Sequence, residues 1–313
     1  KVVEKNGKRL PEKEDEFTIT SQVQNRDGWV NHPLDEQLRK DKSAKLRSIP
    51  VRLLFDDPDL SLRANYTMFD RATGRPLCVG DGESCKRVTL SGMQSLPCPS
   101  PAVCALAQDG NCKPYGRLHV RVEAEGSTEA GTAGDELGSF VFRTTGFNSI
   151  RTLSARLRYL FAVSGGLLGG LPLELRLRGK STTLSHRTPI YYVDLTLRAG
   201  SSLAQVVALA RQEREQQAAL GLDQAALDEA ARQGLALGEF EESEEEGVEV
   251  VEEFYPEPGT EGAHPGDGDH LGTRRARAPS PPISLRGKLH RKQEALGVRA
   301  TATGDPGASH AGT

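Results

Sequence analysis

The chain has 313 residues, of which 36% are hydrophobic, and it carries 40 Lys and Arg against 43 Asp and Glu. No run of about 18 apolar residues and no hydrophobic leader occurs, so we expect a cytoplasmic protein without membrane contact. The charge is unevenly distributed, with +6 over residues 45–200 and −9 over residues 201–313. A basic body joined to an acidic C-terminal part is typical of proteins that meet polyanions, although a solubilising tail gives the same pattern.

The apolar pattern divides the chain into three parts. Residues 1–200 alternate apolar runs with turn residues and predict one α+β domain with a mostly antiparallel sheet. Residues 201–238 are rich in Ala, Leu and Gln and predict two helices that separate at Gly221. These helices either pack on the domain or form an arm for a partner helix. Residues 239–313 begin with nine carboxylates between Glu239 and Glu253 and continue Gly/Pro-rich, which predicts a disordered tail.

In the first half of the domain, strands are expected at residues 15–24, 49–57 and 62–70, and we expect the last two to pair. The following cysteine-rich segment holds too little aliphatic volume to form its own core. Residues 117–125 then alternate strictly, which predicts a half-buried strand with Leu118 inside and His119 in solvent. A flexible loop over residues 126–138 is expected to return the chain through a strand at 140–146.

The second half of the domain holds one predicted helix and two strands. Apolar residues recur at helical spacing over residues 149–166, with Asn148 as the expected N-cap and Gly165-Gly166 as the end. Residues 171–180 and 190–200 predict two further strands because apolar and polar residues alternate along them.

All five cysteines of the chain lie between residues 78 and 112, with the spacing C-x6-C-x12-C-x5-C-x7-C. In a cytoplasmic protein such a cluster is more often a metal site than a disulfide framework. We therefore expect a structural Zn²⁺ ion. Free buried thiols or an iron–sulfur cluster would use the same residues. The preferred ligands are Cys85, Cys98, Cys104 and Cys112, with Cys78 as a possible extra ligand. Three basic neighbours would offset part of the thiolate charge: Lys86, Arg87 and Lys113.

Two other readings of the chain use basic and histidine side chains. Outward-facing arginines on neighbouring strands would suit a general nucleic-acid-binding module. A metal-dependent hydrolase would need a zinc with an open position and a ligand such as His119 or His186. No P-loop, G-x-S-x-G or H-E-x-x-H motif occurs, which disfavours the common enzyme classes. The arginines of the first reading are Arg117, Arg121, Arg176 and Arg178.

Several short motifs of the chain occur in an order that resembles a known family. They are GKRLPEKEDEFTITS at residues 7–21, GDGESCKR at 80–87, the later cysteines up to Cys112-Lys113-Pro114, and FRTTGFNS at 142–149. Together they resemble the recombination directionality factors of phages that use large serine integrases. The chain is also similar to proteins of proteobacterial integrative elements described as hydrolase or metal-binding protein. The resemblance covers about residues 7–200, and the cysteine spacing of this chain is its own.

The resemblance implies a non-enzymatic accessory protein of phage or mobile-element DNA recombination. Such factors bind an integrase and change which attachment-site pairs it synapses, so that excision replaces integration. The expected partners are an integrase or recombinase and DNA. The implied zinc module would hold a loop-rich surface rigid for the protein contact.

Overall fold

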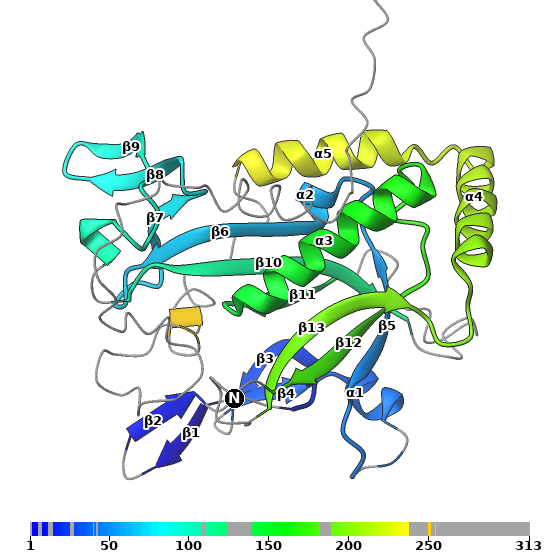
Figure 1. Ribbon diagram of the computed structural model, residues 1–313, viewed down its shortest axis with the longest axis horizontal. Helices are drawn as coiled ribbons and strands as arrows, with labels where there is room; N and C mark the ends of the chain where they lie inside the picture. Colours follow the sequence, from blue (N-terminus) through cyan, green and yellow to red (C-terminus); the bar gives the residue numbers. More distant parts are fainter. Residues whose placement is uncertain are drawn as a thin grey trace, which may run out of the picture.

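The structure of the chain is a computed structural model, and a long sheet runs through its domain (Figure 1). Its described residues are 2–5, 8–11, 15–25, 28–39, 41, 43–107, 110–123, 139–181, 189–237, 250–251 and 254. Among them are nine strands that form one antiparallel sheet, together with two separate two-stranded hairpins and five α-helices. This confirms the predicted α+β class with a mostly antiparallel sheet. The expected tail, the loop over residues 126–138 and His186 lie outside the described residues, apart from residues 250, 251 and 254 of the tail.

The strands of the sheet follow the order β13-β12-β5-β10-β6-β7-β8-β9, and β11 pairs with β10. The bounds of those on the first half of this path are β13 Ile190–Leu197, β12 Leu173–Lys180, β5 Ser48–Leu53, β10 Lys113–Val122 and β11 Phe140–Thr144. On the other half they are β6 Leu62–Phe69, β7 Pro76–Gly80, β8 Ser84–Thr89 and β9 Gly92–Pro97. The separate hairpins are β1 Val2–Lys5 with β2 Lys8–Pro11, and β3 Thr20–Asn25 with β4 Gly28–Asn31.

Strand β10 is the axis of the sheet, and β5 and β6 lie one after the other along a single edge of it. Val120 pairs with Leu53 of β5 and with Phe140 of β11, so these two strands flank β10 on opposite edges. Gly116 likewise pairs with β6 and with β11, which places β6 on the same edge as β5. The expectation that β5 and β6 pair with each other is therefore wrong. The short helix α2 (Pro58–Ser61), capped by the Asp57 side chain, lies between them and lets both bond to β10.

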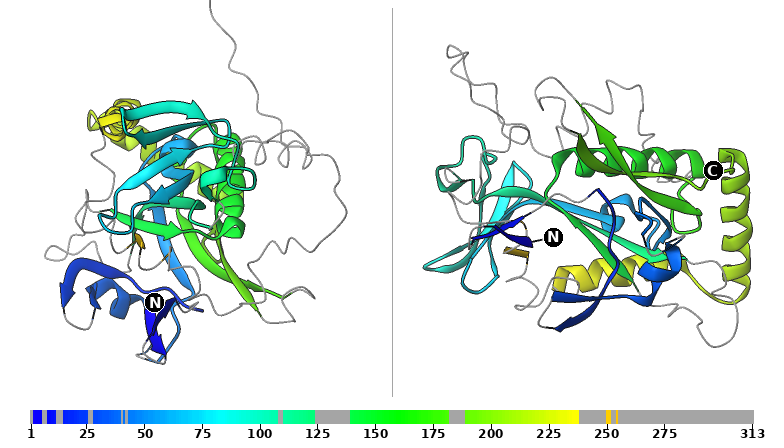
Figure 2. Two further views of the ribbon diagram at one scale, coloured as in Figure 1. Left: turned by 90° about the vertical axis from the view of Figure 1, so that its left-hand side faces the viewer. Right: turned by 90° about the horizontal axis from the view of Figure 1, so that it is seen from below.

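Helices cover both faces of β10. A methyl group on Gly116 would lie 2.9 Å from Ile150, which belongs to helix α3 (Phe147–Ser164). The opposite face carries His119, whose ring lies 6.4 Å from that of Phe55. Phe55 in turn packs with Ala231 of helix α5 (Gln224–Leu237). Figure 2 shows α3 and α5 on opposite sides of the strands. His119 is only 5% exposed, so the prediction that it faces solvent is wrong.

The main core lies between α3 and the half of the sheet formed by β13, β12, β5 and β10. Its fully buried side chains are aliphatic, because the inward positions of these strands alternate with polar ones and α3 presents Leu at helical spacing. Helix α3 ends where predicted, with Gly165 in the left-handed conformation at φ 73°. Asn148 is not its N-cap: the helix begins after Gly146, and the Asn148 side chain accepts a hydrogen bond from Lys180 instead.

Helices α4 (Leu203–Ala219) and α5 separate at Gly221, as predicted, and both pack on the domain. Val206 and Ala210 of α4 join the main core. At the start of α4 the Ser202 hydroxyl and the Gln205 side chain form a capping box. Arg52 of β5 forms ion pairs with Glu123 and with Glu213 of α4, so the helical part is bound to the sheet by buried apolar and charged contacts together.

Helix α1 (Pro33–Leu38) is the remaining helix of the domain and follows the β3–β4 hairpin. Its Asp35 is buried and accepts a hydrogen bond from the backbone N–H of Ile19 at 2.8 Å. Arg39 forms ion pairs with Asp35 and with Glu16. The hydrogen bond to Asp35 is the largest cause of the raised pKa of its guanidinium, followed by the hydrogen bond to Glu16. This polar network attaches the N-terminal segment to the main core.

Candidate functional site

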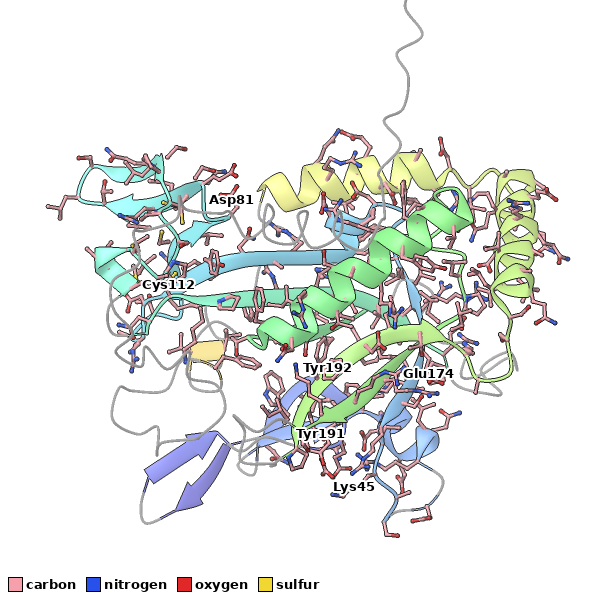
Figure 3. All side chains as sticks on the ribbon, viewed as in Figure 1. Lys45, Asp81, Cys112, Glu174, Tyr191 and Tyr192 are labelled. Atoms are coloured by element: carbon pink, nitrogen blue, oxygen red, sulfur yellow. The ribbon has the colours of Figure 1, made fainter. Side chains whose placement is uncertain are left out.

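The five cysteines gather at the end of the sheet that is farthest from β13. Cys78 lies on β7 and Cys85 on β8, in the meander that β7, β8 and β9 form. The Gly, Pro and Ser content of this segment led us to expect a cysteine-rich loop, and the strands β7, β8 and β9 correct that expectation. Figure 3 shows Cys112 and Asp81 at this end of the molecule.

The three later cysteines lie in the segment that follows β9 and leads to β10. Cys98 follows β9 directly, and its N–H donates to the carbonyl of Glu83 at 2.8 Å. The N–H of Cys104 donates to the carbonyl of Ser100 at 3.0 Å, in a turn where Ser100 has a φ of 70°. Cys112 comes immediately before β10, so the central strand of the sheet begins at the cysteine cluster.

Gly80 permits the close approach of the cysteine-bearing segments. A Cβ atom at this position would lie 2.7 Å from the Cβ of Cys85 and 3.0 Å from the Sγ of Cys98. Real Cβ atoms do not make contacts this short, so a larger residue would force the two cysteines apart.

The Arg87 side chain lies among the sulfur atoms. Its Nε is 3.5 Å from the Sγ of Cys78, and its Nη2 is 3.8 Å from the Sγ of Cys85 and 4.0 Å from that of Cys104. Arg87 and Cys85 are two positions apart on β8, so their side chains share one face of the strand. Of the three basic residues expected to offset the charge, Arg87 contacts the sulfurs of Cys78, Cys85 and Cys104. That i, i+2 spacing was visible in the sequence as a signal for this central position.

The thiols influence one another electrostatically. Burial, followed by the hydrogen bond that the Cys85 thiol makes to Cys78, raises the pKa of Cys85 to about 11. Burial raises the pKa of Cys112 to about 12, and the neighbouring sulfurs of Cys78, Cys98 and Cys104 add to this rise. All five cysteines are free thiols and all five lie within one electrostatic neighbourhood. At Cys85 and Cys112 the neutral thiol is therefore favoured while a metal cation does not share the cluster.

The donor set suits a soft metal ion, because five sulfurs lie together. Their arrangement is not that of a closed coordination sphere. Among the described residues, which include every cysteine, no three His, Cys, Asp or Glu side chains are placed so that they could hold a metal ion. The Arg87 guanidinium instead contacts three of the five sulfurs. The donor chemistry thus fits zinc, and a bound ion would have to take over contacts that Arg87 makes here.

The four candidate nucleic-acid-binding arginines do not form one basic surface. Arg117 is buried, with its guanidinium 5.7 Å from the centre of the Tyr115 ring. Arg176 donates to Glu174 at 2.7 Å, and Arg178 donates to the buried Asp194 at the same distance. Arg121 is half-buried on β10. These contacts offset much of the positive charge that DNA would meet, and direct DNA contact stays a prediction.

His119 does not share a metal sphere with Cys112. It lies on β10, seven residues after Cys112, which is about 23 Å away at ~3.3 Å per residue. Its buried ring faces Phe55 rather than the cysteine cluster. His119 is therefore not available as a metal ligand for the hydrolase alternative. His186, the other candidate, lies outside the described residues.

The chain was then compared with known proteins. The family described as Gp3-like: Recombination directionality factor-like matches residues 1–198, which is more than half of the chain. The chain belongs to this recombination directionality factor-like family. The match contains the whole sheet and the five cysteines, and it ends before α4. No curated protein and no solved structure matches the chain. In the part of the chain described by the structure, no helix is long and apolar enough to span a membrane.

Proposed function

We propose that the chain is a non-enzymatic recombination directionality factor, which binds an integrase and shifts it from integration to excision. The observation that carries this proposal is the family match over residues 1–198. A protein can switch a recombinase without chemistry of its own if it binds one conformation of the recombinase more tightly than another. The shift is then limited by the difference between the two binding free energies.

The proposal includes one structural zinc ion at the cysteine cluster. Cys85, Cys98, Cys104 and Cys112 would hold it, with Cys78 as a possible extra ligand. The convergence of five free thiols from three separate segments supports this assignment. Zinc would cross-link the segments and favour deprotonation of thiols whose pKa is otherwise raised. Arg87 is placed to remain beside the cluster and offset the charge of the thiolates.

The surface around the cysteines is a candidate contact for the integrase. Leu90 and Met93 at the turn of the β8–β9 hairpin are strongly exposed, and so are Val103 and Leu106 after Cys98. Exposed apolar side chains that cluster on one part of a surface often mark a protein interface. A metal cross-link beneath them would hold this surface in one conformation before binding, which reduces the entropy lost on association.

The test is an in vitro recombination assay with the purified integrase of the same mobile element. Adding the protein should favour synapsis and recombination of the excision pair of attachment sites and suppress the integration pair. The double variant Leu90→Asp/Met93→Asp should lose at least about tenfold in this activity, as substitutions of interface anchors do. Leu209→Asp, which changes an exposed leucine of α4, is the matched control and should act like the unmodified chain. An unchanged ratio of excision to integration at saturating protein would refute the proposal.

A general nucleic-acid-binding module remains the second reading, and one titration separates it from the first. It predicts a salt-dependent mobility shift with DNA alone, in the absence of integrase. The described arginines give this reading little support, because Arg176 and Arg178 are paired with carboxylates.

A further inference from the structure

A second apolar cluster lies apart from the main core, at the cysteine end of β6 and β10. The sheet contributes Phe69 from the end of β6 and Tyr115 from β10. The other members come from the C-terminal part of the chain, where Val250 and Val251 are 3% and 5% exposed. Figure 1 shows this short orange segment beside the end of β10 that carries the cysteines.

The contacts between the two parts are specific in geometry. The Phe69 and Tyr115 rings meet edge to face with 5.6 Å between their centres, and Phe254 approaches Tyr115 at 6.3 Å. Lys113 donates a hydrogen bond from Nζ to the backbone carbonyl of Phe254 at 3.3 Å. An aromatic pair and a lysine on the sheet thus receive two β-branched side chains and an aromatic ring. We refer to Phe69, Lys113 and Tyr115 as the aromatic docking surface.

Charge favours the same contact. The segment lies at the end of a tract that holds nine carboxylates and no Lys or Arg between Glu239 and Glu253. The aromatic docking surface contributes the Lys113 ammonium group, and the Arg117 guanidinium lies against the Tyr115 ring. An acidic peptide with a few apolar anchors is the kind of ligand that such a surface recognises.

The two sides of the contact differ in their relation to the family. The aromatic docking surface belongs to residues 1–198, which match the family, whereas the docked segment belongs to the extension beyond them. Lys113 also directly follows Cys112 in the chain, so the docked segment covers surface next to the cysteine cluster. A partner that uses this part of the shared fold would have to compete with the extension.

We propose that the aromatic docking surface is a peptide-binding site that Val250, Val251 and Phe254 of the same chain occupy as a displaceable ligand. The ligand class is a short acidic segment with two β-branched side chains and an aromatic residue three positions after the second. A tethered segment competes at an effective concentration on the order of 1 mM. A partner that presents a similar segment must therefore displace the chain's own before it can bind. This inference goes beyond the recombination role and is tested without an integrase.

The experiment uses a fluorescent peptide with the sequence of residues 247–256 and full-length chains. The double variant Val251→Asp/Phe254→Asp, called the unlocked chain, disrupts the docked segment. Leu222→Asp is the matched control, because it places a charge at an exposed leucine of the same extension, outside the cluster. Fluorescence anisotropy should show saturable binding to the unlocked chain. Binding to the unmodified chain and to the Leu222→Asp control should be at least about tenfold weaker, since both keep the tethered competitor.

Two further measurements make the result decisive. Lys113→Glu, introduced into the unlocked chain, should weaken peptide binding at least about fivefold while the far-ultraviolet circular dichroism and the melting temperature stay unchanged. A peptide with the same two Asp substitutions should not bind. The proposal is overturned if the peptide fails to bind the unlocked chain, or if it binds the unmodified and unlocked chains equally. The outcome of the recombination assay does not affect either result.

Discussion

The two ends of the long sheet are held together by different chemistry. At the end formed by β13, β12, β5 and β10, fully buried aliphatic side chains pack against α3 and α4. At the other end, β8 and β9 expose most of their side chains, and the buried groups between the strands are mainly thiols. Short strands without an apolar layer behind them are marginally stable in water. The end formed by β13, β12, β5 and β10 is therefore stabilised by apolar burial. The cysteine end lacks such an apolar layer, and this is where the proposed zinc cross-link would act.

Metal removal should give the largest difference between the two ends. We expect about one zinc per chain by elemental analysis, and structural zinc sites contribute on the order of 10 kcal/mol of apparent binding free energy. After chelation, amide hydrogen exchange should accelerate over β7, β8 and β9, while β5, β10 and β12 stay protected.

Two serine variants check the zinc prediction. Cys112→Ser should lose the metal, and Val88→Ser, at an exposed position of β8, should keep it. Iron with visible absorbance in place of zinc would support an iron–sulfur cluster at these cysteines. A metal-free chain with full protection at the cysteine end would contradict the cross-link altogether.

A cavity in the apolar end should have the next largest effect. Leu118 of β10 is fully buried, so Leu118→Ala should lower the free energy of unfolding by about 2–5 kcal/mol, through lost burial and the cavity that remains. Denaturant unfolding measures this loss. Leu209→Ala on the exposed face of α4 is the control and should change the free energy by no more than about 0.5 kcal/mol. The zinc content of both variants should equal that of the unmodified chain, and a loss of metal in Leu118→Ala would show that the two ends are not independent.

Adding a single methyl group at one glycine of each end compares the two ends directly. Gly80→Ala would place a Cβ against Cys85 and Cys98, and Gly116→Ala would place one against Ile150 of α3. Each overpacks its site and should cost about 1–3 kcal/mol. Gly116→Ala should lower the melting temperature of the whole domain. Gly80→Ala should instead lower zinc affinity, measured by chelator competition, with a smaller change in melting temperature. Equal effects of both on zinc affinity would argue against separate ends.

Much of the apolar end was predictable from local sequence. The β10–β11 hairpin, helix α3 and the separation of α4 from α5 follow from periodicity and glycine positions, which are short-range signals. The pairing of β5 and β6 with β10 was not predictable in this way. It joins strands far apart in the chain, and the α2 turn between β5 and β6 resembles a hairpin turn.

The candidate site was predictable in composition and not in arrangement. The clustered spacing of the five cysteines identified them as a candidate site. The sequences of β7, β8 and β9 lack apolar alternation, so nothing in them predicted that these strands pair in the sheet. The burial of His119 depends on α5, which returns from a distant part of the chain to cover that face of β10. The apolar residues at positions 250, 251 and 254 were a visible exception within an acidic tract, and that exception was the available signal for docking.

The smallest predicted effect concerns a polar contact that holds α5 on the apolar end. The buried Asp228 carboxylate accepts hydrogen bonds from the backbone N–H groups of Asp56 and Asp57 and from the Gln224 side chain. Asp228→Asn keeps one acceptor oxygen and should change the free energy of unfolding by less than about 1 kcal/mol at neutral pH. Asp228→Ala is the contrasting variant and should lose about 1–3 kcal/mol, because two buried N–H groups lose their partner.

The sign of the pH dependence separates the charge of Asp228 from its hydrogen bonds. Burial raises the pKa of Asp228 above its ordinary value of 3.8, so between these two values the folded protein binds more protons than the unfolded chain. Stability contributed by this group is therefore present below pH 3.8 and is lost as the pH rises through the folded pKa. The free energy of unfolding of Asp228→Asn, measured against that of the unmodified chain from pH 3 to pH 8, should shift in favour of Asn across this interval and then level off. A shift in the opposite direction would mean that the N–H groups of Asp56 and Asp57 stabilise the charged carboxylate by more than burial destabilises it.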